Sequence, residues 1–198
     1  MTKPKIGIII STTREGRFGE RAANWVADLA ASRSDIATEI VDLRDYPLPF
    51  FEAVASPRFV PIDTPEAKKW SAKLAELDGY VFVTAEYNHS ISGVLKNALD
   101  FVFAEPARKP AAFVGYGAVG GARAVEHLRQ IVVELSMVPL NRAVHINMEP
   151  FLGLLRDGKD FADYPYLAPT VDTMLEELAW YAQTLRAGRE QQAEKAAA

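Results

Sequence analysis

The chain has 198 residues, of which 49% are hydrophobic and 24% charged, so it is long enough for one globular domain with a sizeable core. Its net charge of −4 provides no overall basic field, and we expect neither nucleic acid nor an anionic membrane surface as a partner. Because the sequence contains no cysteine, disulfides, thiolate metal sites and cysteine nucleophiles are excluded.

The chain begins with an alternation of apolar runs and helical patterns. KIGIII at residues 5–10 is apolar on both faces, which is typical of a central strand in a parallel sheet. Apolar positions at helical spacing then predict a helix over residues 19–32, and ATEIVDL predicts a second strand. A proline-rich stretch at residues 46–65 is too irregular to be a core element.

The middle of the chain repeats this alternation. Thr64 as an N-cap before Pro65 predicts a helix that continues to about residue 77. GYVFVTA at residues 79–85 predicts a third buried strand, and a helix over residues 93–102 follows after a polar loop.

The last part of the chain contributes two more strands. PAAFVGY predicts the fourth, GGARAVEHLRQIVVELSM the longest helix, and RAVHINM the fifth strand. An irregular segment at residues 150–168 precedes a helix over residues 171–185. We expect residues 189–198 to form a disordered tail.

Five buried strands alternating with helices predict an α/β fold: a doubly wound five-stranded parallel sheet with helices on both faces, in one domain over residues 1–188. Such sheets bind ligands beyond the carboxyl ends of their strands. The loops at residues 11–19, 85–92 and 115–121 follow three of these strands and are rich in polar residues and glycine. We therefore expect a single site where they meet.

The first loop, within STTREGRFGE, has the composition of an anion site. Ser11 and Thr13 can donate from hydroxyl groups, Arg14 and Arg17 from guanidinium groups, and the following helix N-terminus attracts negative charge. The alternative is a solvated turn with ordinary capping residues, which the strand-to-helix position disfavours. Because the Walker A pattern is absent, we interpret the loop as a site for a terminal phosphate rather than for a nucleoside triphosphate.

The third loop matches the dinucleotide fingerprint literally, as Gly115-x-Gly117-x-x-Gly120. It follows the fourth strand rather than the first, and no acidic residue stands about 20 positions further on, where PLNRA is found. Glu149 is too distant to support a dinucleotide site. We interpret the loop as a glycine-rich edge that a flat ring can approach.

The middle loop offers backbone donors and acceptors beside Tyr87 and Asn88, which suits a planar heterocycle. Glu86 is a candidate acid or base, although a lone carboxylate there is more often a surface or interface residue. His89 is nearer to the expected site than the other two histidines. No Ser-His-Asp arrangement, metal-ligand cluster or close carboxylate pair is evident, so we expect no catalytic side chain and no metal site.

These features favour a phosphorylated planar cofactor that brings its own reactivity. FMN fits, with its phosphate in the first loop and its ring edge against the other two.

The segments STTREGRFGER, AEYNHSISGVLKNALDF and GYGAVGGARAVEHLRQ resemble the three signature segments of the NADPH-dependent FMN reductase family. These are flavodoxin-like enzymes that include quinone, azo-dye and chromate reductases. The resemblance extends from the first strand to the fifth, about three quarters of the chain, and leaves out residues 150–168 and the tail.

The resemblance implies FMN contacts from all three loops. The residues at the phosphate and ribityl chain would be Ser11, Thr13, Arg14, Arg17, Phe18 and Gly19. Those flanking the ring would be Ala85, Glu86, Tyr87 and Asn88, and those on its far side Gly115, Tyr116, Gly117 and Gly120. Ala85 stands where the family usually has proline, a change that frees the backbone of this loop and removes no expected side-chain contact.

The resemblance also implies a ping-pong reaction, in which NADPH or NADH passes a hydride to the flavin and an acceptor then takes two electrons. Acceptors in the family include quinones, azo compounds, chromate and free flavin. A homodimer or homotetramer is implied as well, in which Glu86 and Tyr87 would face a neighbouring subunit.

Two other interpretations compete with the enzyme. A flavodoxin-type electron carrier would bind FMN without oxidising a nicotinamide, but flavodoxins generally lack arginine in the phosphate loop and are more acidic than this chain. The sequence is also compatible with a third interpretation, a regulatory protein that is controlled by its flavin. The first strand begins at Lys5, which leaves no room for a signal peptide, and no apolar run approaches the roughly 20 residues of a membrane span. We therefore expect a cytoplasmic protein.

Overall fold

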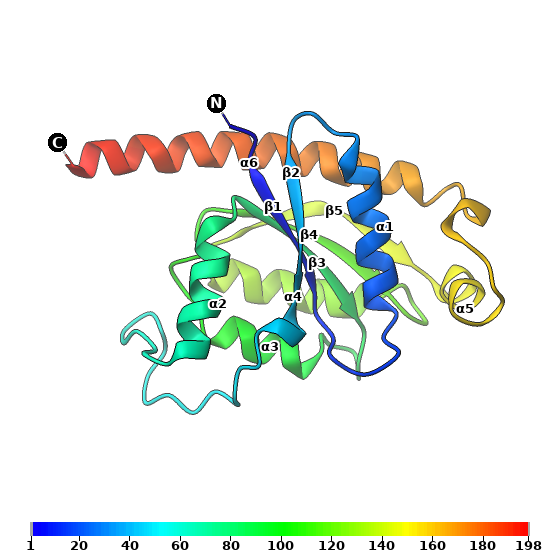
Figure 1. Cartoon of the computed structure of the whole chain (residues 1–198), viewed down its shortest axis with the longest axis horizontal. Helices are drawn as coiled ribbons and strands as arrows, with labels where there is room; N and C mark the ends of the chain where they lie inside the picture. Colours follow the sequence, from blue (N-terminus) through cyan, green and yellow to red (C-terminus); the bar gives the residue numbers. More distant parts are fainter. Residues whose placement is uncertain (1, 198) are drawn as a thin grey trace.

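The computed structural model of the chain describes residues 2–197, in which strands and helices alternate (Figure 1). The strands are β1 (Lys5–Ile10), β2 (Ala37–Asp42), β3 (Gly79–Ala85), β4 (Pro110–Tyr116) and β5 (Val138–Ile146). The α-helices are α1 (Gly19–Ala31), α2 (Pro65–Glu76), α3 (Gly93–Asp100), α4 (Ala122–Glu134), α5 (Met148–Arg156) and α6 (Ala168–Ala197). Two 3₁₀ turns are η1 (Leu43–Asp45) and η2 (Phe161–Asp163).

The five strands form one sheet in the order β2-β1-β3-β4-β5, and every neighbouring pair is parallel. The chain first runs outward from β1 to β2 and then crosses back to β3 on the other side of β1. The direction of winding therefore reverses between β1 and β3, which is where open parallel sheets bind ligands. The predicted doubly wound parallel sheet is confirmed.

The core lies in two layers because strand side chains alternate between faces. Ile8 of β1 packs in a cluster that includes Val26 of α1 and Leu178 of α6. Its neighbour Ile9 belongs to a second cluster with Trp70 of α2, which donates from its indole nitrogen to the Ala98 carbonyl at 2.8 Å. Helices thus cover both faces, as predicted.

The segment after β5 differs from its prediction. Residues 150–168 were expected to be irregular, but α5 extends to Arg156 and η2 follows. Gly153 makes this segment a poor match to a helical pattern, because glycine weakens a helix by about 1 kcal/mol relative to alanine. Its absent side chain leaves the space that the hydroxyl of Tyr164 occupies. Packing therefore outweighs helix propensity here.

The end of the chain also differs. The expected helix over residues 171–185 is part of a longer α6, and residues 189–197, expected as a disordered tail, continue it; residue 198 lies outside the described residues. Arg186 and Arg189 of α6 pair with Asp78 before β3 at 3.5 and 2.8 Å. These contacts, together with an alanine- and glutamine-rich sequence, favour the longer helix.

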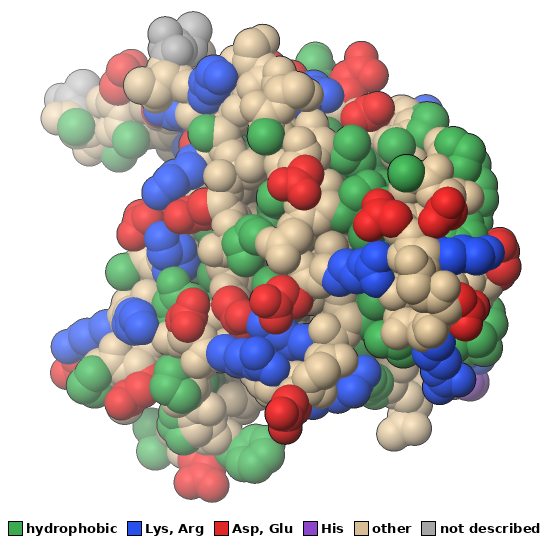
Figure 2. All heavy atoms as spheres, turned by 45° about the vertical axis from the view of Figure 1, so that its right-hand side comes forward, with side chains coloured by type: hydrophobic (Ala, Val, Ile, Leu, Met, Phe, Trp, Pro, Cys, Tyr) green, Lys and Arg blue, Asp and Glu red, His purple; other side chains and the backbone are tan. Residues whose placement is uncertain are grey.

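Figure 2 shows acidic and basic side chains intermingled over the face that it presents, without an extended patch of one sign. In the part of the chain that the structure describes, no helix is both long and apolar enough to cross a bilayer.

Candidate flavin-binding site

The three loops singled out in the sequence all follow carboxyl ends of strands at one edge of the sheet. The first follows β1, the second β3 and the third β4, and β1, β3 and β4 are adjacent. In Figure 1 the first loop, in dark blue, lies at the opposite end of β1 from the N-terminus. The sheet order therefore brings together loops that lie up to about 100 residues apart in sequence.

The first loop is tied to its neighbours by buried hydroxyl groups. Ser11 Oγ donates to the carbonyl of Val83 at 2.7 Å, and the hydroxyls of Thr12 and Tyr116 lie 3.4 Å apart. Ser92 Oγ in turn donates to the Ser11 carbonyl, which connects the loop to the start of α3. Ser11 is fully buried. Its single hydroxyl proton is thus used within the protein, so Ser11 supports the loop from below.

The backbone of this loop is left with donors to spare. Within residues 2–197, the N–H groups of residues 12–18 donate to no other protein group. In contrast, the carbonyls of Thr12, Thr13 and Arg14 all accept hydrogen bonds from arginine side chains. A run of free backbone N–H groups before a helix N-terminus is an anion-binding arrangement.

Arg17 does not face the same space as Arg14. Its guanidinium group is only 2% exposed and pairs with Asp42, with Glu20 at 3.5 Å from it. The hydrogen bond with Asp42 raises the pKa of Arg17, so it stays charged. Burial raises the pKa of Asp42, but the hydrogen bonds from Arg17 and from the Arg44 N–H outweigh it and lower that pKa below its usual range.

Arg14 instead lies at a cavity between the first two loops. Its Nε donates to the Tyr87 hydroxyl at 3.1 Å, and its side chain is exposed. The cavity measures about 660 Å³, a size typical of ligand sites. It is lined by Thr12, Thr13, Arg14, Leu48, Pro49, Phe50, Tyr87, Ser92, Gly93, Val94 and Asn97. A smaller cavity of about 340 Å³ adjoins it and shares Thr13, Leu48, Val94 and Asn97 with it.

The second loop contains a tight turn. The backbones of Tyr87 and Ser90 exchange hydrogen bonds of 2.9 and 3.0 Å. The two residues between them, Asn88 and His89, have φ angles of 50° and 67°. Few residue types accept that left-handed conformation, with asparagine and histidine among the more tolerant. Ser90 Oγ lies 2.7 Å from Nδ1 of His127 on α4, which holds the turn from outside.

Glu86 has a structural partner in this loop. Its carboxylate accepts from the Arg123 backbone N–H at 3.1 Å and pairs with the Arg123 guanidinium group at 2.5 Å. The N-cap of α4 is Gly121, which has no side chain to offer, so Glu86 caps that helix from another loop. The side chain of Glu86 is 7% exposed. These contacts leave little capacity for acid or base catalysis.

The third loop packs behind the first rather than lining the cavity. Tyr116 is buried, and its ring lies 5.1 Å from that of Phe18, which in turn lies 5.0 Å from that of Phe151 on α5. Gly19 passes so close that an added Cβ would lie 2.9 Å from the Tyr116 hydroxyl. Phe18, Gly19 and Tyr116 therefore form the base on which the first loop rests.

The glycines of the third loop are required by close packing at Gly115 and Gly120 and by backbone conformation at Gly117 and Gly120. Gly117 and Gly120 have φ angles of 129° and 63°. A Cβ on Gly115 would lie 2.5 Å from the Gly120 carbonyl oxygen, and one on Gly120 would lie 2.8 Å from His145 Cβ. His145 also bonds the Gly120 carbonyl through Nδ1 at 2.9 Å. These contacts account for the literal dinucleotide pattern without a dinucleotide.

The sequence patterns did not reveal the fourth side of the site. Asp42 is the last residue of β2, Arg44 lies in η1, and the segment from Leu48 to Phe50 lines the cavity. Asn97 of α3 holds that segment, since it donates to the Pro49 carbonyl at 2.8 Å and accepts from the Phe51 N–H at 2.9 Å. The charged residues after the second strand were the available signal.

A five-stranded parallel sheet in the order 2-1-3-4-5, with free backbone donors after the first strand, defines an α/β protein of the flavodoxin-like class. The chain belongs to the NADPH-dependent FMN reductase family, which it matches over residues 4–150.

Individual relatives agree with this assignment. The chain is 35% identical over 144 residues to an NAD(P)H-dependent FMN reductase of Nectria sp, which covers 68% of this chain and 72% of the relative. It is 35% identical over 146 residues to a 2-hydroxy-1,4-benzoquinone reductase of Burkholderia sp, which covers 70% of this chain and 75% of the relative.

Among solved structures, the fold is similar to FerB, a flavoenzyme NAD(P)H:(acceptor) oxidoreductase from Paracoccus denitrificans. The TM-score is 0.69 at 19% identity, over 91% of this chain and 98% of FerB. At that identity the similarity concerns the fold.

Proposed function

We propose that the protein is an FMN-dependent NAD(P)H oxidoreductase that reduces quinones or related flat acceptors by two electrons in a ping-pong reaction. Family membership supports the class of reaction, and the Burkholderia relative supports a quinone as acceptor. The observation on this chain that carries the proposal is the free backbone N–H run at residues 12–18, beside the exposed Arg14.

The residues around the cavity fit FMN in kind and in size. A phosphate dianion suits the backbone donors of the first loop and the charge of Arg14. A flat ring suits the apolar wall of Leu48, Phe50 and Val94. The volume of about 660 Å³ lies within the range of small-molecule and cofactor sites.

Within this proposal the first loop supplies two kinds of residue. Thr13, Arg14 and the N–H groups of residues 12–18 bind the phosphate and ribityl chain. The other residues support the loop without contacting the cofactor, because their hydrogen bonds and packing contacts lie inside the protein; these are Ser11, Arg17, Phe18 and Gly19.

The other two loops serve the ring. Ala85, Glu86, Tyr87 and Asn88 provide its edge through their backbone and the Tyr87 ring, while Glu86 itself stays with Arg123. Gly115, Tyr116, Gly117 and Gly120, which do not line the cavity, act at one remove by shaping the turn on which the first loop rests.

Bound FMN would supply the two-electron redox chemistry in this site. The chain itself holds and orients the flat reactants, and the apolar wall of the cavity limits the access of water to them. We assign no side chain an obligatory proton transfer, because the one carboxylate in the second loop is occupied by Arg123. The proposal includes both NADPH and NADH as co-substrates.

We also propose a homodimer or homotetramer and a cytoplasmic location. The exposed apolar side chains of Tyr87 and Val94 at the rim of the cavity support the first, with exposed fractions of 39% and 40%. The absence of cysteine is consistent with the second. Light scattering coupled to gel filtration measures the assembly; a monomer at micromolar concentration would contradict it.

The proposed function is tested on the purified full chain. The absorption spectrum and chromatography of the released flavin should identify FMN, and NADPH or NADH should be oxidised when menadione is added. Tight FMN binding without any nicotinamide oxidation would contradict the enzyme function and favour a flavodoxin-type electron carrier. Failure to bind FMN at micromolar concentration would reject both.

A further inference from the structure

The carboxyl end of β2 contributes a charged network to the loop that follows β1. Asp42 accepts from both terminal nitrogens of Arg17, one of them at 2.7 Å, and from the Arg44 backbone N–H at 2.9 Å. The guanidinium group of Arg17 is 2% exposed and the Asp42 side chain 22%. We call these three residues the Asp42 network.

The network engages three successive carbonyls of the first loop. Arg17 donates to the carbonyl of Thr12. Arg44 donates from Nε to the Thr13 carbonyl at 3.1 Å and from Nη2 to the Arg14 carbonyl at 2.7 Å. Two arginines thus fix the direction of three consecutive peptide planes.

The direction of the carbonyls fixes that of the donors. These peptides are trans, so the carbonyl of one residue and the N–H of the next lie in one plane and point in opposite directions. Because the carbonyls of residues 12–14 face the network, the N–H groups of residues 13–15 face away from it. Within residues 2–197 these N–H groups donate to no protein acceptor.

We propose that Asp42, Arg17 and Arg44 are positioning residues that hold the backbone N–H groups of residues 13–15 in the arrangement that binds the phosphate of FMN. The inference rests on the proposed function, because it concerns the same cofactor. It assigns Arg17 an indirect role in place of the direct phosphate contact that the sequence suggests.

Charge balance separates this role from simple electrostatic attraction. Arg17 and Arg44 carry two positive charges, and Asp42 and Glu20, which both lie against Arg17, carry two negative ones. The group therefore adds little net field at the loop, and what it provides is the shape of the backbone. Arg14 lies outside the network and keeps its charge for the cavity.

The test uses the direction in which a single substitution changes the affinity for FMN. Asp42→Asn removes a negative charge near an anion site, so electrostatics alone would tighten FMN binding. Loss of the carboxylate that holds the Arg17 guanidinium group and the Arg44 backbone N–H should instead weaken FMN binding about tenfold, as for one lost charge-assisted contact. Asp45→Asn is the matched control, because it makes the same charge change on an exposed residue of η1 outside the network.

The measurement is the dissociation constant for FMN and, in parallel, for riboflavin, which lacks the phosphate. We expect Asp42→Asn to lower the preference for FMN over riboflavin about tenfold and Asp45→Asn to leave it unchanged. Arg44→Lys keeps the positive charge but lacks the fork of donors that reaches both the Thr13 and the Arg14 carbonyl, so it should give the same loss and serves if Asp42→Asn does not fold.

Unchanged or tighter FMN binding by Asp42→Asn, or an equal loss for riboflavin, would overturn the positioning role. Absence of FMN binding by the unaltered chain is a different result, since it rejects the proposed function itself.

Discussion

Arg14 and Arg17 lie three residues apart in one loop, yet their guanidinium groups have different surroundings. Arg17 is buried against a carboxylate that belongs to the neighbouring strand. Arg14 is exposed, and its contact is an uncharged hydroxyl, that of Tyr87. A charge already paired inside the protein has little left to offer a ligand, whereas an exposed charge at a cavity does. The partner, rather than the residue type, decides the role.

Replacing Arg14 by alanine should therefore weaken FMN retention directly. A charge-assisted hydrogen bond contributes about 1.5–3 kcal/mol, and because Arg14 is exposed we expect the lower end, roughly a tenfold rise in the FMN dissociation constant. Flavin fluorescence titration measures it at two salt concentrations. Arg142→Ala, at another exposed arginine, is the control, and an equal effect there would remove Arg14 from the site.

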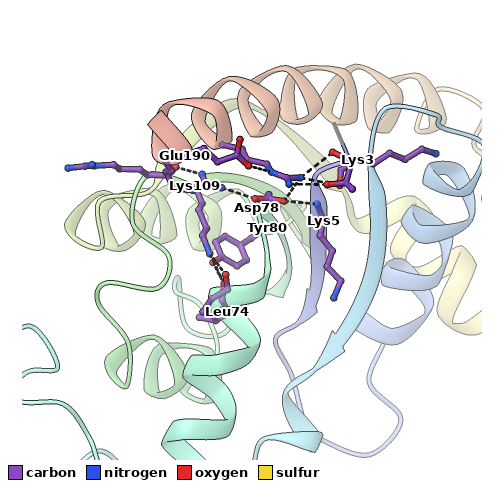
Figure 3. Close-up of polar contacts among 12 residues, drawn as sticks. Lys3, Lys5, Leu74, Asp78, Tyr80, Lys109 and Glu190 are labelled. Carbon is purple, nitrogen blue, oxygen red and sulfur yellow. Dashed lines mark hydrogen bonds and ion pairs between the residues drawn. The ribbon is translucent and has the colours of Figure 1, made fainter. Parts of the chain in front are cut away.

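Lys109 is a charged residue of a different kind, because its ammonium group is enclosed at the amino end of β4. Nζ donates to the carbonyls of Leu74 and Ala75 at the end of α2, at 2.8 and 3.0 Å (Figure 3). Burial, with a smaller effect of Arg189, lowers the pKa of Lys109 from 10.5 to about 8, and Asp78 and Glu105 act against that change.

This lowered pKa makes a contribution to stability that depends on pH. Below about pH 8 both folded and unfolded chains carry the proton, so the full cost of burying the charge is present. As pH rises above 8 the folded chain loses its proton first, and stability gains. The free energy of unfolding of the unaltered chain should therefore rise relative to that of Lys109→Met between pH 7 and 9.

Chemical denaturation at several pH values measures this difference. Lys73→Met is the matched control: hydrogen bonds with Glu76 and Glu39 raise the pKa of Lys73, so its contribution is constant below its unfolded pKa of 10.5. A flat difference for Lys109 would mean that its ammonium group is not desolvated.

At the scale of secondary structure, α4 holds the second loop through one face. Arg123 and His127 are four residues apart, so they lie on the same side of the helix, and they contact Glu86 and Ser90 respectively. The loop in return caps the helix through Glu86. The shape of the Tyr87 turn, which forms one wall of the cavity, is therefore coupled to the position of α4.

Substituting Arg123 by methionine should loosen this turn. The nearly buried Glu86 carboxylate would lose its charged partner, and we expect a loss of about 1–3 kcal/mol in unfolding free energy. Hydrogen exchange of residues 86–92 should also become faster than in the unaltered chain. Glu126→Gln changes an exposed residue of the same helix, 70% exposed, and should leave exchange unchanged. Equal protection in both variants would mean that α4 does not hold the loop.

The sequence was sufficient for elements whose local pattern and packing agree. GYVFVTA and PAAFVGY are apolar on both faces, and their predicted bounds are those of β3 and β4. Patterns failed where a distant contact decided the outcome. Gly153 obscures α5 because the space that it leaves is filled by Tyr164. The helix α6 also continues past the predicted end, where Arg189 pairs with an aspartate more than a hundred positions away.

The same reasoning applies to the site. The three loops could be located because strand ends in a parallel sheet lie at one edge. The pairing of Arg17 with Asp42 could not, since nothing local distinguishes a paired arginine from a free one. The lining by the proline-rich segment depends on Asn97, which holds it through two backbone contacts from another element.

For the whole molecule, α6 closes the side of the sheet that is remote from the cavity. Arg186 donates to the Thr2 carbonyl at 3.2 Å, and Arg189 donates to the Arg108 carbonyl and to Asp78, each at 2.8 Å. The helix thereby connects the start of β1 with the residues before β3 and β4. In contrast, residues 191–197 are all exposed.

Two truncations separate these parts of α6. Deleting residues 191–198 should change the unfolding free energy by less than about 0.5 kcal/mol, because the side chains of residues 191–197 are all exposed. Deleting residues 186–198 removes both arginine partners of Asp78, which is 17% exposed, and should cost about 1–2 kcal/mol. Thermal and urea unfolding measure both. Equal stability of the two would show that the arginine contacts contribute nothing.

Both ends of the described chain lie beyond the amino ends of the strands, at the edge of the sheet opposite the cavity (Figure 1). The hydrogen bond from Arg186 to the Thr2 carbonyl holds this part of α6 beside the first residues of the described chain. An affinity tag, a solid support or an electrode linked through either end would therefore leave the cavity facing the solution. The protein can be immobilised in one orientation without blocking the molecules that exchange electrons with it.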